Sequence, residues 1–332
     1  MADRYDRKKI LIMGWALWVP VPLFFALATS WTQLPLGMFL YGVLFSGPAS
    51  SAYIVGQAAK GKMTSTFTLL VSAWGVGYML APTLAGFLAE ALGMRWVFFL
   101  TTVFYFITTI LLTQISSQHP KKDEVSAEEA QKTWDGSPFR RGRIFLLSTL
   151  FASVMFLLSL VFPLVPQFLS DVYRLDIVQI GILGSFTYLG GSTLSLIMGR
   201  IGDRHGKTTA VSIAMILVAI ALTIFICVDS FASLIFASFL RGASFPMWAF
   251  IGATVGPIAP VASRARWISV VQTVTQVVSI LAPYVGGILY AHSPQAPFLL
   301  TIGGSVMLAL IAQTPLFKER VASDTLRSVV TN

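Results

Sequence analysis

Long apolar segments separated by short polar ones recur along the whole chain. There are ten of them, and each is close to the 18 to 25 residues that a membrane-spanning helix needs. Hydrocarbon tolerates such continuous runs only as helices, because helices satisfy their own backbone hydrogen bonds, and the runs lack the strict alternation of barrel strands. The pattern predicts an all-α membrane protein with about ten transmembrane helices, near residues 10–28, 35–57, 64–88, 96–114, 144–168, 178–198, 209–228, 231–255, 267–290 and 297–317.

The composition of the chain agrees with this pattern. Of its 332 residues 55% are hydrophobic and only 11% are charged, and the mean hydropathy is +0.77. A soluble domain carries about 25% charged residues, which cover its surface. The missing charge indicates that the lipid bilayer surrounds most of this protein.

The basic residues fall in alternate polar segments, and this sets the expected orientation. If the N-terminus is cytoplasmic, 20 of the 23 Lys and Arg residues lie in cytoplasmic segments, and the outer loops keep only Arg95 and Arg174. Basic loops resist translocation. We therefore expect a multi-pass protein of the plasma membrane with both termini in the cytoplasm. We attribute the net charge of +9 to the basic residues of these cytoplasmic segments and expect no nucleic-acid partner.

The second half of the chain repeats the first at an offset of about 200 residues. At this offset Asp3-Arg4 matches Asp203-Arg204, and Tyr41 matches Arg241. The offset spans six helices, an even number, so the two units cross the membrane in the same direction. Two inverted five-helix repeats are disfavoured. Further matches pair Leu40, Gly42, Phe45, Val55 and Gly56 with Leu240, Gly242, Phe245, Val255 and Gly256.

One cytoplasmic segment carries a family signature. Residues Gly199-Arg200-Ile201-Gly202-Asp203-Arg204-His205-Gly206-Lys207 resemble the G-x-x-x-D-R-x-G-R/K loop of the major facilitator superfamily, and residues 77–88 with Arg95-Trp96 resemble its fifth helix and the turn into the sixth. The resemblance implies two helical bundles and secondary transport of a small organic solute, with drug-like efflux as the first substrate hypothesis. We expect no cofactor.

The start of the chain departs from that family pattern. Residues 2–9 correspond to the second half of the signature, so the ten spans correspond to family helices three to twelve and the first two helices are unrepresented. A misplaced start, a real truncation and a gene remnant all remain open. We expect a truncated N-terminal bundle of four spans over residues 1–114, a cytoplasmic linker over 115–143 that is either a solvated tether or a short surface helix, and a six-helix bundle over 144–332.

Two sets of residues are expected to serve conformational change. In the family, signature contacts latch the two bundles together, although ordinary positive-inside charge explains the same residues without a latch. Proline and small residues within spans allow helices to bend and to pack closely. The candidate latch residues are Asp3, Arg4, Gly199, Asp203, Arg204, Gly206 and Lys207, and the candidate bend and packing residues are Pro82, Gly86, Pro283, Gly286 and Gly287.

Arg241 is the basic residue well inside a span, which makes it the first candidate for substrate contact. Burying it costs about 2.5 to 3.5 kcal/mol on insertion scales. It either meets an anionic or strongly polar group of a substrate beside aromatic rings, or it only holds the bundle together. The cavity candidates are Tyr41, Phe45, Arg241, Ser244, Phe245, Trp248, Gln272 and Gln276.

The middle of the spans contains no Asp or Glu in the sequence. Proton relays need such groups at depth, so the sequence leaves a coupling ion, proton or sodium, undetermined. No P-loop, metal-ligand cluster or nucleophile with a base indicates an enzyme. The main alternative to a transporter is a non-transporting remnant, scaffold or receptor on the same helices. A channel is disfavoured because parallel repeats and a duplicated latch imply rocking.

Overall fold

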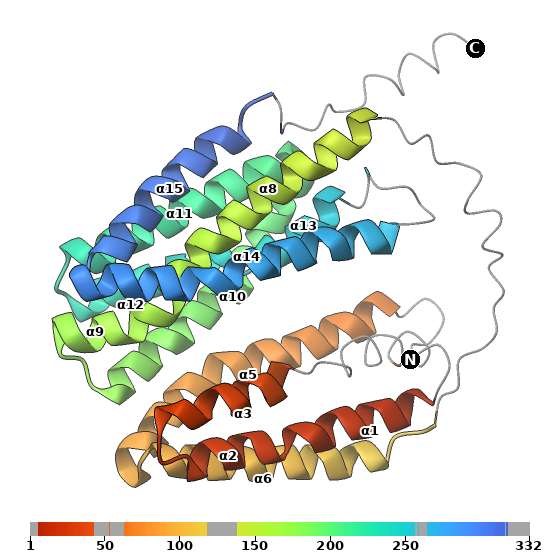
Figure 1. Ribbon diagram of the computed structural model, residues 1–332, viewed down its shortest axis with the longest axis vertical. Helices are drawn as coiled ribbons and strands as arrows, with labels where there is room; N and C mark the ends of the chain where they lie inside the picture. Colours follow the sequence, from red (N-terminus) through yellow and green to blue (C-terminus); the bar gives the residue numbers. More distant parts are fainter. Residues whose placement is uncertain are drawn as a thin grey trace. The chain divides into compact units, whose positions relative to one another are not determined.

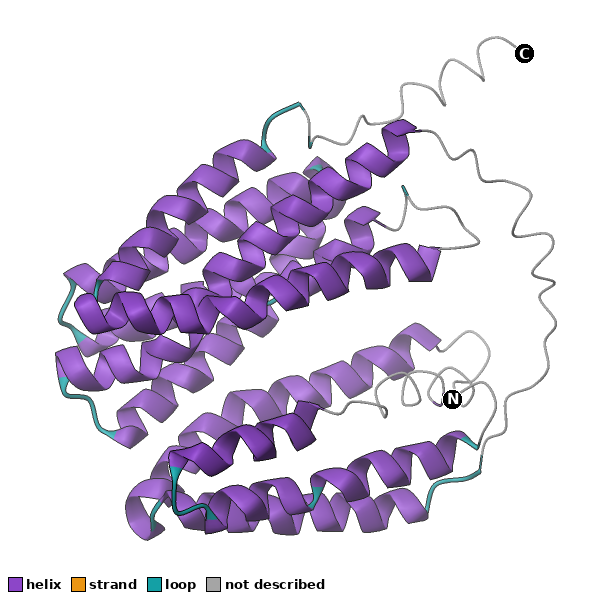
Figure 2. Cartoon of the chain, viewed as in Figure 1, coloured by secondary structure: helices purple, strands orange, loops and turns teal. Residues whose placement is uncertain are grey.

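The computed structural model describes residues 6–42, 53, 63–117, 138–255, 258, 264–315 and 317. Within these residues every regular element is a helix, which confirms the all-α class (Figures 1 and 2). Eight helical segments are long and apolar enough to cross a membrane, and Ala296–Ala312 is a shorter apolar helix. These nine segments coincide with nine of the ten predicted spans. Only the first part of the span predicted at 35–57 is described, as the helix Leu34–Gly42.

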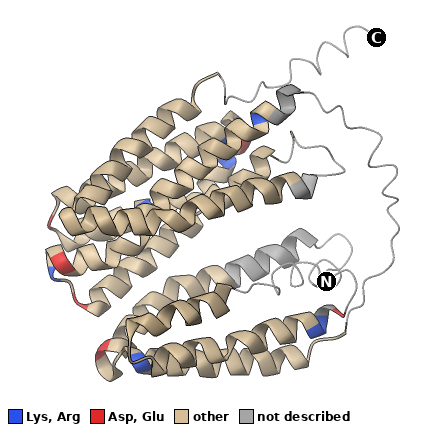
Figure 3. Cartoon of the chain, viewed as in Figure 1, with Lys and Arg blue, Asp and Glu red and all other residues tan. Residues whose placement is uncertain are grey.

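The chain divides into two compact units. Unit 1 comprises residues 1–125 and 177–181, and unit 2 comprises residues 126–176 and 182–332. The chain passes between them within the predicted linker, residues 118–137 of which lie outside the described part, so the tether and the short helix remain alternatives. Along the described helices the charged residues gather near helix ends and leave long uncharged stretches, as a membrane span requires (Figure 3).

In unit 1, helices α1, α2 and α5 pack against α6, and α3 packs against α2. An Asp6 carboxylate oxygen caps the first helix by accepting a hydrogen bond of 3.0 Å from the backbone N–H of Lys8. Pro20 and Pro22 then separate the first two helices at Val19, because proline has no N–H to donate. The elements are α1 (Arg7–Trp18), α2 (Pro20–Leu27), η1 (Trp31–Gln33), α3 (Leu34–Gly42), α5 (Met63–Leu92) and α6 (Met94–Thr113).

Unit 2 is a bundle with a continuous buried core. Helix α8 packs along α14, and α11 packs along α15, so that the four helices enclose apolar side chains. The fully buried large side chains include Phe151, Phe168, Phe225 and Phe298. The elements are α8 (Pro138–Val161), η2 (Phe162–Leu164), α9 (Val165–Tyr173), α10 (Ile177–His205, whose residues 177–181 belong to unit 1), α11 (Lys207–Cys227), α12 (Phe231–Arg241), η3 (Gly242–Ser244), α13 (Met247–Val255), α14 (Arg264–His292) and α15 (Ala296–Ala312).

Two spans of unit 2 that we predicted as continuous helices are interrupted. In the span predicted at 144–168, the α-helix ends at Val161 and a 3-10 turn follows, because Pro163 and Pro166 remove backbone donors. In the span predicted at 231–255, α12 ends at Arg241, η3 follows, and Pro246 precedes the start of α13. Each span therefore crosses as two helices joined by a short 3-10 element.

Candidate functional site

Both helix interruptions of unit 2 meet at the side chain of Arg241, the last residue of α12. Its Nη2 atom donates a hydrogen bond of 3.0 Å to Oγ1 of Thr187 on α10. Its Cζ atom lies 5.2 Å from the centre of the ring of Phe162 in η2, within the range of a cation–π interaction. A cation is thus held between two broken helices, an arrangement that also builds the midplane binding sites of membrane transporters.

The surroundings of Arg241 are almost wholly apolar. A small cavity of about 20 Å³ borders the side chain, and its lining supplies two hydroxyl groups and no carboxylate. The Nε atom of Arg241 is buried without a hydrogen-bond partner, and no described Asp or Glu forms an ion pair with the guanidinium. The cavity is lined by Leu158, Val161, Phe162, Val218, Leu222, Arg241, Ser244 and Thr301.

Thr187 positions the guanidinium, and the sequence analysis did not find it. Its side chain is buried, and its hydroxyl donates to the carbonyl of Leu183 at 3.0 Å while accepting from Arg241. Threonines in membrane helices commonly bond back to the carbonyl four residues earlier. Nothing in the sequence distinguishes this threonine from the others, because its role comes from the packing of α10 on α12.

Three glycines bring α10 and α12 into backbone contact beside Arg241. A Cβ atom at Gly190 would lie 1.9 Å from the carbonyl oxygen of Phe239, and one at Gly242 would lie 2.2 Å from the backbone nitrogen of Gly191. Only hydrogen fits at such distances. The close approach fixes the end of α12 against α10 and holds Arg241 within reach of Thr187.

The structure brings together only part of the predicted cavity set. Ser244 shares the small cavity with Arg241. The Phe245 ring instead packs over Gly191 and lies 5.2 Å from the ring of Tyr188. The remaining candidates of unit 2 lie outside the lining of that cavity: Trp248 on α13 is 39% exposed, and on α14 Gln272 is half-buried and Gln276 exposed.

Tyr41, the repeat equivalent of Arg241, lies in unit 1 in a purely aromatic setting. Its ring centre is 5.4 Å from that of Trp18, whose ring is in turn 5.6 Å from Trp15. Trp15 also stacks edge-on against Tyr105 of α6 at 5.6 Å. Phe45, the other predicted residue of this span, lies outside the described residues.

The family signature of unit 2 is helical rather than the loop that we expected. Helix α10 continues to His205, and the turn is confined to Gly206, whose φ of +94° suits glycine. Lys207 then begins α11. Asp203 and Arg204 are exposed in the last turn of α10, and Asp203 forms no hydrogen bond or ion pair with another described residue. Asp3 and Arg4 lie outside the described residues.

Some of the predicted bend and packing residues lie where two helices touch, and others do not. Pro283 lies inside α14, and a Cβ atom at Gly286 would come within 2.3 Å of the carbonyl oxygen of Leu160 on α8. Gly287 is exposed and has open space around it. In unit 1, Pro82 lies inside α5 and Gly86 is buried on the same helix. Of the two neighbouring glycines of α14, Gly286 and not Gly287 is therefore the one that allows α14 to contact α8.

No group of three His, Cys, Asp or Glu side chains in the described part of the chain could hold a metal ion. The site around Arg241 offers one fixed cation, hydroxyl groups and aromatic rings. Such a set binds anionic or polar groups next to an apolar body; it does not contain the nucleophile and base that covalent chemistry requires.

Several characterised proteins are similar to this chain. The sialic acid transporter NanX of Escherichia coli is 25% identical over 65% of this chain and 54% of its own length. The multi-drug resistance efflux pump PmrA of Streptococcus pneumoniae is 25% identical over 62% of this chain and 53% of its own length. Multidrug resistance protein 2 of Bacillus subtilis is 23% identical over 96% of this chain and 81% of its own. The chain spans about half the length of the first two relatives.

Solved structures show the same fold. The nucleoside transporter NupG superimposes with a TM-score of 0.78 at 14% identity, over 96% of this chain and 85% of that one. A crystal structure of the peptide transporter POT gives a TM-score of 0.72 at 14% identity, over 94% of this chain and 80% of that one. The sequence model of the Major Facilitator Superfamily matches residues 1–176 and again residues 154–329. The resemblance noted in the sequence is therefore confirmed, and the chain belongs to the Major Facilitator Superfamily.

Proposed function

We propose that the chain acts as a secondary transporter that moves a small organic solute across the membrane by alternating access between two helical bundles. The named relatives are transporters and efflux pumps, and the expectation that the chain is not an enzyme agrees with its family. The proposed bundles are residues 1–114 and 144–332, joined by the linker over 115–143. Both termini are proposed to lie in the cytoplasm, because that arrangement places most Lys and Arg residues there.

Arg241 carries the proposal for the substrate. A guanidinium held in an apolar setting by one neutral hydroxyl and one ring face lacks the counter-ion that usually accompanies a buried charge. A solute with an anionic group would supply that counter-ion during transport. The buried and unpartnered Nε atom supports this assignment, since it is a donor with no acceptor among the described residues.

The relatives suggest two substrate classes, and Arg241 favours one of them. One relative is named as a transporter of sialic acid, and two are named for drug resistance. We propose an organic acid as the solute, with its acidic group at Arg241 and the rest of the molecule against aromatic side chains. Phe245, Trp248, Gln272 and Gln276, as well as Tyr41 and Phe45, remain candidates for contact with other parts of the solute.

The signature residues are proposed to act as a latch. Asp203, Arg204 and Lys207 flank the turn at Gly206, and Asp203 has an exposed carboxylate with no described partner. Such a group can bind a helix N-terminus in one conformation and release it in another. Asp3 and Arg4 are proposed to act in the same way in the first bundle.

Counterflow in proteoliposomes tests the substrate site. Vesicles loaded with unlabelled sialic acid should take up labelled sialic acid, and Arg241→Gln should raise the half-saturation concentration about tenfold or more, as expected for a lost charged hydrogen bond. Arg241→Lys should keep part of the affinity, because it keeps the charge but not the planar fork. Arg174→Gln is the matched control, since Arg174 is exposed and follows α9 at the bundle end.

The outcomes separate the hypotheses. Unchanged affinity and rate in both Arg241 variants would refute the role of Arg241 at the substrate site. If folded wild-type protein moves neither sialic acid nor the cationic dye ethidium, the alternative of a non-transporting membrane protein is favoured. Flux of ethidium alone, unaffected by either variant, would support transport but exclude an acidic solute.

A further inference from the structure

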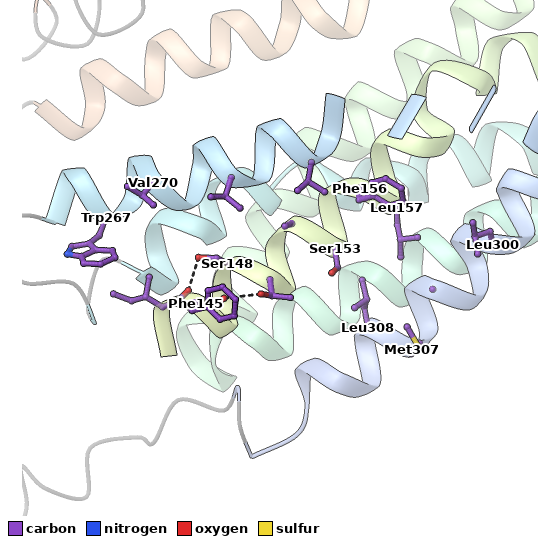
Figure 4. Close-up of a pocket in the computed structure, with 16 residues that line it drawn as sticks. Phe145, Ser148, Ser153, Phe156, Leu157, Trp267, Val270, Leu300, Met307 and Leu308 are labelled. Carbon is purple, nitrogen blue, oxygen red and sulfur yellow. Dashed lines mark hydrogen bonds between the residues drawn. The ribbon is translucent and has the colours of Figure 1, made fainter. Parts of the chain in front are cut away.

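Two cavities of unit 2 differ in their chemistry. The larger is an apolar groove of about 640 Å³ between α8, α14 and α15 (Figure 4), and none of the described residues that line it is charged. Two of its hydroxyl groups are already bonded, since Ser148 donates to the carbonyl of Ile144 at 2.7 Å and Thr149 donates to that of Phe145 at 3.1 Å. The groove thus offers no fixed charge to an ion. The small cavity at Arg241 does.

The cavity at Arg241 is lined by hydrogen-bond donors that have no acceptor. A guanidinium carries five N–H donors, and among the described residues Arg241 donates one hydrogen bond, to Thr187. Its Nε atom is buried without a partner. Ser244 follows three residues later and lines the same cavity, and its hydroxyl forms no hydrogen bond with a described residue. A cationic donor and a hydroxyl donor therefore share one cavity.

The rest of the cavity lining favours an anion over a water molecule. Thr301 supplies the other hydroxyl group, but its proton is donated to the carbonyl of Pro297 at 2.8 Å. The remaining side chains of the lining are apolar. A water molecule would bridge the hydroxyl groups but would leave the buried positive charge of Arg241 uncompensated. An anion accepts from both free donors and also balances that charge.

The size of the cavity limits which anion fits. One water molecule needs about 10 to 15 Å³, and this cavity has a volume of about 20 Å³. A monatomic ion somewhat larger than water matches that volume. A carboxylate attached to an organic body does not, so its access to Arg241 requires the surrounding helices to move, as they do in alternating access.

We propose that this cavity binds a halide ion, with chloride as the probe, between the guanidinium of Arg241 and the hydroxyl of Ser244. The ion is an exchangeable counter-ion: it balances the charge of Arg241 while the solute is absent and leaves when the acidic group of the solute arrives. The exchange rests on the proposed transport function, whereas the binding of chloride does not. Chloride and an acidic solute therefore compete for Arg241.

Equilibrium dialysis of the purified full chain against radioactive chloride tests the binding itself. Gluconate keeps the ionic strength constant, because it is too large for the cavity. Wild-type protein should bind chloride saturably, Arg241→Gln should weaken binding about tenfold or more, and Ser244→Ala about threefold or more, as expected for lost hydrogen bonds to a charged group. Ser279→Ala on α14 is the matched control, a half-buried serine outside the lining. No saturable binding by folded wild-type protein, or equal binding by Arg241→Gln, would overturn the proposal.

A change of volume locates the ion without removing a donor. Val218→Ile adds a methyl group to the wall of the cavity and should weaken chloride binding about tenfold. Val211→Ile is the matched control, because Val211 lies on the same helix and is equally buried but is not part of the lining. Both variants overpack the core, so a loss confined to Val218→Ile reports the cavity rather than general destabilisation. Chloride binding by folded Val218→Ile equal to that of wild type would contradict the assigned position.

Counterflow separates this proposal from the proposed transport function. Replacing gluconate by chloride should raise the half-saturation concentration of sialic acid and leave the maximal rate unchanged, as expected for competition at one site. Saturable uptake that chloride does not affect would refute the counter-ion role and leave transport standing. Saturable, Arg241-dependent chloride binding by a protein that moves no solute would support the ion site and refute transport.

Crystals of wild-type protein grown in bromide keep the proposal testable if a variant fails to fold. Bromide is a halide whose anomalous scattering distinguishes it from water. A peak of anomalous density between Arg241 and Ser244 is the expected result. Ordinary density there without an anomalous signal would identify a water molecule and overturn the proposal.

Discussion

Tyr41 and Arg241 occupy equivalent positions of the internal repeat, yet the structure gives them opposite surroundings. Tyr41 lies in unit 1 against Trp18, within a group of aromatic rings. Arg241 lies in unit 2 at the meeting point of two interrupted helices, bonded to the hydroxyl of Thr187. An uncharged aromatic residue and a buried cation cannot make the same contact with a solute. The two repeat units thus differ in chemistry at this equivalent position, which is aromatic in unit 1 and cationic in unit 2.

The two units also differ in how far they bury their helices. Helix α6 of unit 1 has no buried residue, whereas α11 of unit 2 buries eleven, among them Phe225. In a membrane an exposed apolar side chain is solvated by lipid, so exposure there carries little penalty. Packing between helices therefore stabilises unit 2 more than unit 1, and this contrast can be tested by equal substitutions in both.

The largest expected effect is the loss of a buried ring in unit 2. Phe225→Ala should lower the free energy of unfolding by about 3 kcal/mol or more, because it leaves a cavity in the core. Phe104→Ala in α6 should change it by less than about 1 kcal/mol, since Phe104 is 57% exposed and lipid replaces its contacts. Titration with sodium dodecyl sulfate in mixed micelles measures both. Equal losses would remove the contrast between the units.

The next effect comes from the backbone contact beside Arg241. Gly190→Ala should destabilise the protein by about 1 to 3 kcal/mol, because the new methyl group meets the backbone of α12. Gly77→Ala in α5 of unit 1 is the matched control, since open space surrounds Gly77. Thermal unfolding in detergent compares them. A Gly190→Ala protein as stable as wild type would show that α10 and α12 are not in close contact.

A smaller effect is expected at the hydrogen bond between α9 and α14. The hydroxyl of Tyr290 on α14 donates to the Asp171 carboxylate on α9 at 2.8 Å in an exposed position. Tyr290→Phe should therefore lower stability by about 0.5 to 1 kcal/mol. Tyr284→Phe on the same helix should have no effect, as Tyr284 is exposed with no such bond among the described residues. The same thermal assay detects the difference, and identical melting curves would contradict it.

The smallest effect on stability is expected at the proposed latch. Asp203→Asn should change the unfolding free energy by no more than about 0.5 kcal/mol, because the carboxylate is exposed without a described partner. It should nevertheless slow solute flux in proteoliposomes, because a latch acts on the exchange between conformations. Glu90→Gln is the control, as an exposed acidic residue on α5 that lies outside the signature. Unchanged flux for Asp203→Asn would assign Asp203 to ordinary surface charge.

The sequence predicted the helices well because long apolar segments are a strong indication of membrane-spanning helices. An apolar run of about 20 residues has few alternatives in hydrocarbon, and nine of the ten predicted spans have a helical counterpart among the described residues. The interruptions were missed even though Pro163 and Pro246 were visible. Proline is tolerated within membrane helices, so its presence alone does not decide between a continuous helix, as at Pro283, and a break.

The candidate site was predicted only in part, for a different reason. Arg241 is conspicuous because a charge inside a span is rare. Its partners Thr187 and Phe162 come from other helices, and their proximity depends on how α10, α12 and η2 pack. The apolar groove between α8, α14 and α15 likewise brings residues 144–157 together with residues from beyond 266. Periodicity within one helix carries no information about such neighbours.

The central claim is that Arg241 keeps its charge available for an acidic solute. Thr187→Asp places a carboxylate where the hydroxyl now accepts from Arg241, and so gives the cation an internal counter-ion. Thr187→Asn has the same shape without the charge and serves as the control. Counterflow of sialic acid by the two folded variants is the decisive measurement. The account predicts that Thr187→Asp loses uptake while Thr187→Asn retains most of it. Equal uptake by both variants would contradict it.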